Sequence, residues 1–175
     1  WGEQCVEAFN GMWAFAIWDD RKKRLFCSRD RLGVKPFHYY LDEKNQRFYF
    51  SSELKQLCQI PQVPRVLNEE YLAANLIYSI TDYNEDTLIK GINVLPGGNN
   101  LSIQLDKELS RIQTVKRYCY WDLQVSWKKK ELKDLIAKVK DEIERSVKYR
   151  LRSDIPVGAL LSGGLDSSCI VAETC

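Results

Sequence analysis

Residues 156–168 constrain the fold of this chain more than any other stretch. They read Pro-Val-Gly-Ala-Leu-Leu-Ser-Gly-Gly-Leu-Asp-Ser-Ser. The apolar run predicts a short buried strand over 156–161, the glycine pair predicts a tight turn, and residues 165–175 predict the start of a helix. A long amphipathic helix is predicted just before, over 127–151. Helix, buried strand, glycine turn and helix are typical of the beginning of a parallel α/β domain.

The preceding residues show a different pattern, in which short apolar runs alternate with polar turns. The runs predict a four-stranded antiparallel meander, whose first strand is buried on both faces, and two further strands. The predicted strands lie at 12–19, 24–28, 37–41, 47–50, 101–105 and 114–121. Short helices are expected up to residue 10, from Ser51 or Ser52 to Leu57, and over 69–80 with Asn68 as the N-cap. The change of pattern predicts a boundary near 121–127, with one domain over 1–122 and a second over 123–175.

Composition and charge exclude several classes of protein. Apolar residues make up 45% of the chain and charged residues 29%, which is typical of a globular protein and argues against a disordered or fibrous one. A formal charge of +2 favours neither nucleic acid nor an anionic membrane, and Lys128–Lys130 is interpreted as a solvated helix start. No apolar run approaches the roughly 18 residues of a membrane span. With no leader pattern and abrupt ends, we interpret the chain as an internal piece of a longer cytoplasmic protein.

Six cysteines stand at 5, 27, 58, 119, 169 and 175. No pair has the spacing of a zinc or redox motif, and the chain holds one histidine, His38. The cysteines are therefore expected to be reduced structural thiols. We expect His38 to be a half-buried, hydrogen-bonded side chain, and the charged run 29–31 to belong to a hairpin loop.

The glycine turn carries residue types that can hold phosphate. The glycine pair 163–164 lets a backbone approach a ligand closely, and the first N–H groups of the next helix lack partners. Ser162, Ser167 and Ser168 add hydroxyls, while Asp166 indicates a bridging metal. The same residues would also serve as an ordinary helix cap, so both interpretations stay open. A P-loop is excluded because no Gly-Lys-Ser/Thr follows, and a dinucleotide fingerprint because a third glycine is missing.

The Ser-Gly-Gly-Leu-Asp-Ser string resembles the pyrophosphate loop of ATP pyrophosphatases. Together with five earlier segments in the same order, it makes the chain resemble the glutamine-dependent asparagine synthetase family. The five segments are Gly11–Asp19, Arg29–Tyr40, Phe50–Lys55, Gly91–Pro96 and Tyr120–Asp122. One departure is visible, because the family usually carries Pro-Pro-Gly-His where this chain has Pro96-Gly97-Gly98-Asn99. The departure puts a turn in question and leaves the functional expectation in place.

The resemblance implies a fold of two parts. The first is the C-terminal part of an N-terminal nucleophile glutaminase domain, an αββα sandwich of the α+β class. The second is the start of an α/β ATP-pyrophosphatase domain, like those of the adenine nucleotide alpha hydrolases. In such enzymes the first cysteine releases ammonia from glutamine, and the ammonia passes through an internal tunnel. Aspartate attacks the α-phosphorus of ATP-Mg²⁺, giving β-aspartyl-AMP and pyrophosphate, and ammonia then displaces AMP.

The resemblance also assigns residues to the ATP site and the tunnel. Leu160 would contact the adenine side, Asp166 would bind Mg²⁺, and Met12 and Val34 would line the ammonia route, with plain core packing as their alternative. The ATP and pyrophosphate site would comprise Leu160, Ser162, Gly163, Gly164, Leu165, Asp166, Ser167 and Ser168. No catalytic residue is expected here, because the nucleophilic cysteine lies upstream in similar proteins and Cys5 is interpreted as structural. The chain alone is therefore expected to be inactive.

Several alternatives stay open. Partners are expected to be the small molecules aspartate, glutamine and ATP, without nucleic acid or membrane, and a homodimer is one option for the assembly. A related synthetase with another acceptor, such as one closing a β-lactam ring or amidating a cell-surface sugar, fits the same motifs. A non-catalytic relative that keeps the fold is a second alternative. A tRNA-modifying ATP pyrophosphatase shares the loop but fits neither the low net charge nor the glutaminase-like half.

Overall fold

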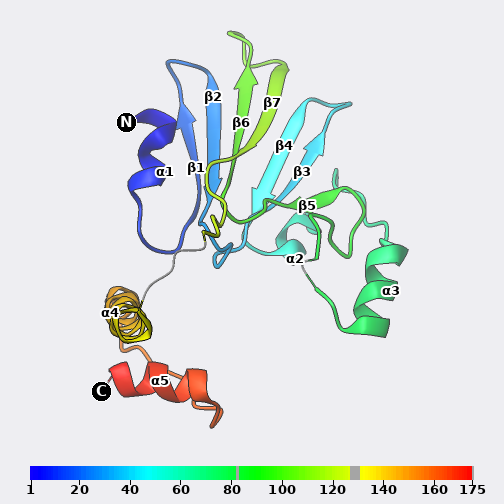
Figure 1. The fold of residues 1–175 in the computed structure, drawn as a ribbon. Coiled ribbons are helices and arrows are strands. Elements are labelled where there is room, and N and C mark those ends of the chain that lie inside the picture. The colour runs from blue at the N-terminus through cyan, green and yellow to red at the C-terminus, as the bar shows by residue number, and fades with distance from the viewer. Residues whose placement is uncertain (82, 127–130, 175) are drawn as a thin grey trace. The chain divides into compact units, whose positions relative to one another are not determined.

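The computed structural model describes residues 1–81, 83–126 and 131–174, and the chain divides into two compact units, 1–123 and 124–175. The first unit holds two antiparallel sheets, with strand orders β1-β2-β6-β7 and β4-β3-β5 (Figure 1). The strands are β1 Ala14–Asp19, β2 Arg24–Arg29, β3 His38–Asp42, β4 Arg47–Ser51, β5 Ile92–Val94, β6 Asn99–Leu105 and β7 Ile112–Cys119. The six predicted strands of this unit therefore exist, with ends shifted by a few residues.

The predicted four-stranded meander is wrong, although its two hairpins are correct. β1 pairs with β2 and β3 pairs with β4, but β2 then pairs with β6, and β3 with β5. The segment between β2 and β3 carries the chain from one sheet to the other. It is longer than the two to five residues of a common hairpin loop. Pairing with β6 also places β2 in a buried core with Leu101 and Ile103. The free energy gained by burying these apolar side chains outweighs the advantage of pairing with the strand that follows next in the sequence.

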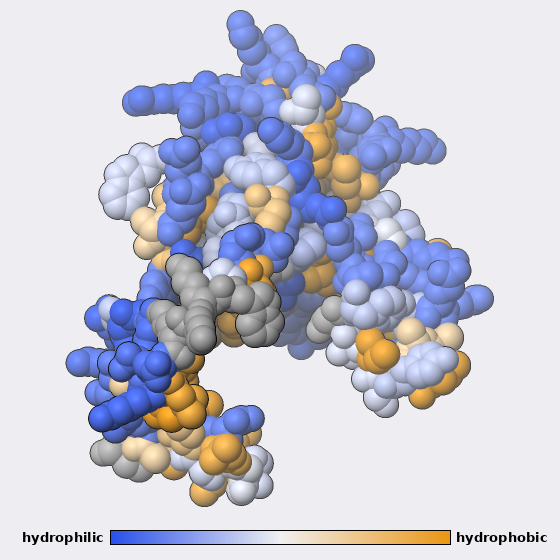
Figure 2. Space-filling model, in the orientation of Figure 1, coloured by the Kyte–Doolittle hydropathy of each residue, from blue (hydrophilic) through white to orange (hydrophobic). Residues whose placement is uncertain are grey.

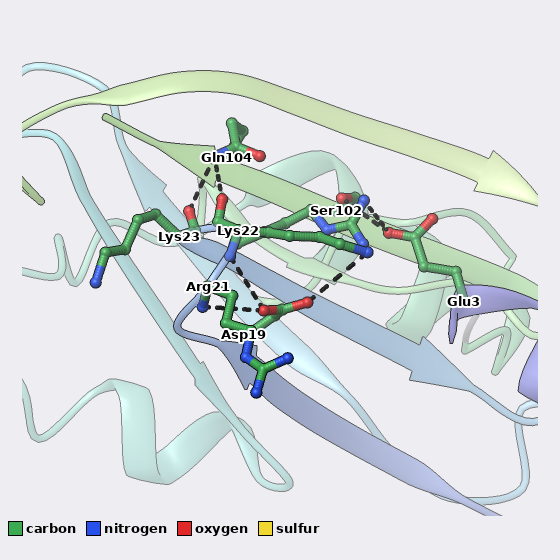
Figure 3. Close-up of polar contacts among 8 residues, drawn as sticks. Glu3, Asp19, Arg21, Lys22, Lys23, Ser102 and Gln104 are labelled. Carbon is green, nitrogen blue, oxygen red and sulfur yellow. Dashed lines mark hydrogen bonds and ion pairs between the residues drawn. The ribbon is translucent and has the colours of Figure 1, made fainter. Parts of the chain in front are cut away.

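The β1–β2 turn is closed by polar side chains, as its sequence predicts (Figure 3). Asp19 Oδ1 accepts the backbone N–H groups of Arg21 and Lys22, each at 3.1 Å. From β6, the Gln104 side-chain amide donates to the carbonyls of Lys22 and Lys23 at 2.7 and 3.1 Å. These contacts fix the turn to the neighbouring strand, and with it the register of the larger sheet.

The main core lies between the two sheets. It consists of buried side chains of β2 and β6 and of residues adjoining β3 and β5, with aromatic residues of β3 and β4 packed against them: Cys27, Phe37, Leu95, Leu101 and Ile103, with Tyr39 and Phe48. β1 was predicted to be buried on both faces, and this is wrong. Ile17 and Trp18 are 51% and 41% exposed, because β1 is the edge strand of its sheet.

Short helical segments lie on the outer faces of the sheets. The 3-10 turn Gly2–Gln4 and helix α1, Cys5–Ala8, place Glu3 against Ser102 and Tyr118 of the larger sheet. On the smaller sheet, helix α2, Leu54–Leu57, contacts β3 and β4 and forms a second core with Val63 and Ile92. The first unit therefore has the layer order helix, sheet, sheet, helix.

The predicted caps of the next two helices have different outcomes. Ser51 or Ser52 was expected to cap α2, but the N-cap is Glu53, which forms a capping box with Gln56. For α3, Glu69–Tyr78, the predicted Asn68 cap is confirmed, since its side chain accepts the Tyr71 N–H at 3.3 Å. α3 ends before residue 80 because Ser79 adopts the left-handed conformation.

The second unit holds helices α4, Leu132–Arg150, and α5, Leu165–Thr174. The predicted first residues of the long helix, including Lys128–Lys130, lie outside the described residues. Segment 156–161 was predicted to be a buried strand, and this is wrong: it is unpaired and exposed. A parallel strand needs a neighbour for its backbone groups, and the described residues of this unit include no other strand. Within the described chain, no helix is both long and apolar enough to cross a membrane.

Candidate functional site

The glycine turn before α5 leaves its backbone open. Gly163 has φ +81°, in the region that favours glycine, and a Cβ built there would meet no heavy atom within 4 Å. The Ser168 N–H donates to the Gly164 carbonyl at 3.1 Å, which is the first turn of the helical ladder. The amides just before Ser168 lie outside that ladder, at the positive end of the helix dipole. This arrangement suits the binding of an anion.

Hydroxyl groups tie the two sides of the turn together. Ser162 Oγ lies 2.9 Å from Ser167 Oγ, and Ser167 Oγ donates to the Gly164 carbonyl at 3.1 Å. The structure thus brings Ser162, Gly164 and Ser167 into contact, and the binding role assigned to them stays a prediction. Ser168 is exposed at the same helix end.

The other residues predicted for this site are not gathered around it. Leu160 and Leu165 are 96% and 86% exposed, and Asp166 is exposed in the first turn of α5. Among the described residues, no three His, Cys, Asp or Glu side chains form a group that could hold a metal ion. Asp166 therefore has the chemistry of a single carboxylate ligand, and Mg²⁺ commonly takes one or two carboxylates together with substrate phosphates.

The two residues predicted for the ammonia route lie in the first unit. Met12 and Val34 are 41% and 52% exposed, so neither belongs to the buried core of the described residues, and their role in an ammonia route stays a prediction. The backbone at or next to each of these two positions is hydrogen-bonded to the carboxylate of Asp30. The N–H of Trp13, next to Met12, donates to Asp30 Oδ2 at 3.3 Å, and the Val34 N–H donates to Asp30 Oδ1 at 2.9 Å.

Arg29 and Asp30 were expected to belong to a hairpin loop, and this is wrong, because β2 and β3 lie in different sheets. Asp30 is 1% exposed, and its carboxylate also accepts the N–H groups of Leu32 and Lys35 at 3.2 and 2.9 Å. The Arg29 guanidinium donates to three carbonyls on the other side, those of Gly33, Lys35 and Leu95, at 2.6 to 2.7 Å. The spacing of an aspartate and a glycine three residues later was the available signal for this turn.

Glycines allow this loop to lie close to the segment before β6. Gly33 has φ +65°, and a Cβ there would lie 3.1 Å from Arg29 Cζ. A Cβ on Gly97 would lie 2.7 Å from the Gly33 nitrogen, closer than real contacts allow. Gly97 stands where the family usually has the second proline of Pro-Pro-Gly-His. This difference from the family pattern therefore falls where the backbones of Gly97 and Gly33 are in contact.

Aromatic residues just after β7 and just before β1 contact the same region. The Tyr120 hydroxyl donates to the Arg29 carbonyl at 2.8 Å, and its ring stacks on Trp13. Burial raises the pKa of Tyr120 to about 12, so the hydroxyl stays a donor over the ordinary pH range. His38 is half-buried with Nδ1 3.1 Å from the Ser52 carbonyl, as expected.

The cysteines that the structure describes are free thiols. Cys27 is buried in the main core, Cys5 and Cys58 are half-buried, and Cys119 and Cys169 are exposed. Cys5 is the first residue of α1, and its structural role stays a prediction. Burial raises the pKa of the Cys27 thiol to about 12, so Cys27 is chemically inert at neutral pH.

Comparison with known proteins follows the division of the chain. Residues 1–119 match the glutamine amidotransferase domain family, and residues 138–174 match the asparagine synthase family. A Methanocaldococcus jannaschii protein, provisionally named glutamine-hydrolysing asparagine synthetase 2, is 42% identical over 97% of this chain and 32% of its own length. Asparagine synthetase 3 (glutamine-hydrolysing) of Bacillus subtilis is 33% identical over 98% of this chain and 26% of its own length.

A more distant relative has a different name. Amidase chyE of Penicillium rubens is 27% identical over 97% of this chain and 24% of its own length. The chain thus spans between about a quarter and a third of the curated relatives it matches. A glutamine amidotransferase match covers most of the chain, and an asparagine synthase match follows it. The chain therefore belongs to the glutamine-dependent asparagine synthetase family.

Proposed function

We propose that the protein carrying this chain makes asparagine from aspartate, using ATP and ammonia released from glutamine. The observation that carries the proposal is the position of the open glycine turn. The turn lies inside the asparagine synthase match and follows, in the same chain, the match of residues 1–119 to the amidotransferase family. The substrates are small molecules, the site of action is the cytoplasm, and a homodimer is the assembly to test.

The two parts of the chain have different tasks in this proposal. Residues 1–122 supply the C-terminal part of an N-terminal nucleophile glutaminase domain, and their helix–sheet–sheet–helix layers support that fold. Residues 123–175 begin an ATP-pyrophosphatase domain. The cysteine that attacks glutamine is not among these residues, and the chain contributes the wall of the ammonia route at Met12 and Val34.

The turn before α5 would hold the phosphates of ATP. Backbone N–H groups around Gly163 and Gly164, with the hydroxyls of Ser162, Ser167 and Ser168, would bind pyrophosphate oxygens, and Leu160 would lie on the adenine side. Mg²⁺ at Asp166 would neutralise the charge that develops on the leaving pyrophosphate. Phosphoryl chemistry of this kind depends mainly on positioning and charge stabilisation, which fixed amides and a helix end provide. Aspartate activated as β-aspartyl-AMP would then accept ammonia.

The Asp166→Asn variant of the full-length protein tests this assignment. Asparagine formation should fall about 100-fold, equivalent to about 3 kcal/mol of transition-state stabilisation, because the amide cannot hold the metal as the carboxylate does. Glutamine hydrolysis should survive, since it uses the other site. Asp141→Asn, an exposed carboxylate on α4, is the matched control and should leave both rates unchanged. Undiminished asparagine formation in the Asp166 variant would exclude the metal role.

Two simpler measurements test the division of labour. The chain of 175 residues alone should show neither glutamine hydrolysis nor asparagine formation, because it spans a third or less of the length of the relatives in which we expect both sites. In the full-length protein, ATP with Mg²⁺ should raise the thermal midpoint, as any ligand that binds only the folded state does. A full-length protein that ATP fails to protect would instead be a non-catalytic relative that keeps the fold.

A related synthetase with another acceptor is the second candidate function. The likeness to amidase chyE favours it, because that relative is not named an asparagine synthetase. Synthesis assays with aspartate and with other carboxylic acids, each with ATP and glutamine, separate the two candidates. Pyrophosphate release that depends on aspartate supports asparagine synthesis.

A further inference from the structure

The loop 30–35 combines a fixed backbone with exposed apolar side chains. Leu32 and Val34 are 77% and 52% exposed. Two charged side chains, those of Arg29 and Asp30, are hydrogen-bonded to main-chain groups of the same loop. The loop is therefore held by two ionic groups, which indicates that the placement of its side chains matters.

Asp30 holds the loop from within. Four backbone N–H groups converge on its carboxylate at 2.9 to 3.3 Å, three from the loop and one from Trp13 before β1. Its own N–H and C=O are also used, since the N–H donates to the Trp13 carbonyl at 2.8 Å and the C=O accepts the Gly98 N–H at 2.8 Å. Hydrogen bonds to an ionised acceptor are about twice as strong as neutral ones, so this one residue joins three backbone segments firmly.

Arg29 holds the same loop from the opposite side. Its guanidinium spans from the Gly33 and Lys35 carbonyls to the Leu95 carbonyl, which belongs to the segment between the two sheets. The contact of Gly33 with Gly97 leaves no space for the loop to shift toward that segment. These contacts tie the loop to residues next to both sheets.

We infer that Asp30 is a positioning residue for ammonia transfer: by binding the Trp13 and Val34 amides to one carboxylate, it holds Met12 and Val34 in place as walls of the route. The inference rests on the proposed function. Ammonia is small and soluble, so a route that delivers it without loss must keep water out. Apolar side chains on a fixed backbone exclude water from the route. If these side chains moved, water could enter and ammonia could escape to solvent.

The Asp30→Asn variant of the full-length protein tests the inference. The new side-chain NH₂ would face backbone N–H groups, and the charge that gathers them would be lost. Asparagine formed per glutamate released should fall about threefold or more, because a shift of about 1 Å in a positioned group has large effects. Glutamine hydrolysis itself and synthesis from added ammonium chloride should both persist. The readout is therefore the coupling of the two sites, which general loss of stability would not move selectively.

Asp42→Asn is the matched control. Asp42 is also buried, at 7% exposed, and its carboxylate accepts the backbone N–H and side-chain amide of Asn45 in the β3–β4 turn. These hydrogen bonds stay within the β3–β4 turn, so its variant should keep the parent's ratio of asparagine to glutamate. An equal loss of coupling in both variants would contradict a specific role for Asp30.

A second variant covers the case in which Asp30→Asn does not fold. Arg29→Lys keeps the charge and stem but loses the fork that reaches three carbonyls, and it should lower coupling in the same direction. An unchanged ratio in a folded Asp30 or Arg29 variant overturns the inference, and so does a parallel loss of all activities. If the unmodified protein forms no asparagine from either nitrogen source, the proposed function itself fails, which is a different result.

Discussion

The two units of this chain differ in how much apolar surface they bury. In the first unit, Cys27, Leu101 and Ile103 are at most 1% exposed. In the second, every described residue is at least partly exposed, although α4 carries an apolar face that includes Ile136 and Val139, at 62% and 56% exposed. Residues of α4 line a groove of about 420 Å³ with Cys169 of α5, and Figure 2 shows apolar surface gathered on these two helices.

The difference shows which elements can form within a single stretch of chain. An α-helix pairs its own backbone, so α4 and α5 exist with their apolar faces uncovered. A strand needs a neighbour, which β2 finds in β1 and β6, and segment 156–161 does not find among the described residues. Each described strand of the first unit therefore has at least one partner, while the second unit leaves apolar helix faces uncovered, in keeping with relatives that are much longer.

The largest expected effect comes from removing buried side-chain volume. Ile103→Ala should lower the free energy of unfolding of the first unit by about 3 to 4 kcal/mol, because it leaves a cavity between the sheets. Val139→Ala on α4 should cost less than about 1 kcal/mol, since that side chain is largely in solvent. Urea unfolding followed by tryptophan fluorescence and far-UV circular dichroism measures both. Equal losses of unfolding free energy in the two variants would contradict the difference in burial between the units.

A pair of glycine substitutions gives the next effect in size. A Cβ on Gly98 would lie 2.3 Å from the Trp121 carbonyl oxygen at φ +67°, so Gly98→Ala should cost about 2 to 3 kcal/mol. Gly163 has φ +81° in open space, so Gly163→Ala should cost only the backbone strain of about 1 kcal/mol. Thermal unfolding of each variant provides the measurement. A larger loss at Gly163 would show that the turn before α5 is packed rather than open.

Features set by neighbours in the sequence could be predicted. The β1–β2 turn depends on Asp19 and the amides two and three residues after it, and the Asn68 cap binds an amide three residues on. The glycine turn before α5 belongs to this class, since Ser162, Gly164 and Ser167 meet within one turn. Local propensity and local hydrogen bonding decide such features, and both are visible in a short window.

Features that join distant segments could not be predicted. Phe26 stands opposite Ser102 across the β2–β6 pair, and Arg29 reaches the Leu95 carbonyl, 66 residues away. An apolar strand fits several partners equally well, so its pattern does not identify one. The role of Asp30 was missed for the same reason, because its carboxylate also binds the Trp13 amide on the far side of a hairpin.

The pH dependence of stability should also differ between the two units, with an effect that is smaller than those of the Ile103 and Gly98 substitutions above. Burial raises the pKa of Cys27 from about 9 to about 12, so the unfolded thiol ionises at a pH where the folded one stays protonated. Stability is then complete below about pH 9 and falls as the pH rises toward about pH 12. By about pH 10 the loss should be about 1 to 2 kcal/mol. Urea midpoints against pH should flatten in Cys27→Ala and keep their slope in Cys169→Ala, the exposed control; equal slopes in all three proteins would contradict the burial argument.

The smallest effect contrasts a half-buried ion pair with an exposed one. Glu3 lies 2.9 Å from Arg24, accepts the Tyr118 hydroxyl at 2.6 Å and contacts Ser102 (Figure 3), whereas Glu142 pairs with Arg145 on the exposed face of α4. Because Arg24 Nε is buried without a partner, Glu3→Gln should cost about 1 kcal/mol, against less than about 0.5 kcal/mol for Glu142→Gln.

The same variant has a spectroscopic readout. Burial and, next, the hydrogen bond to Glu3 raise the pKa of Tyr118 to about 12. Without the Glu3 charge, the Tyr118 phenol should titrate closer to its ordinary value, and ultraviolet difference absorbance follows this change directly. Glu142→Gln should leave the tyrosine titration untouched. A tyrosine titration that is the same in both variants would mean that Glu3 does not hold the first helical turn against the larger sheet, and the layer it forms would be only loosely attached.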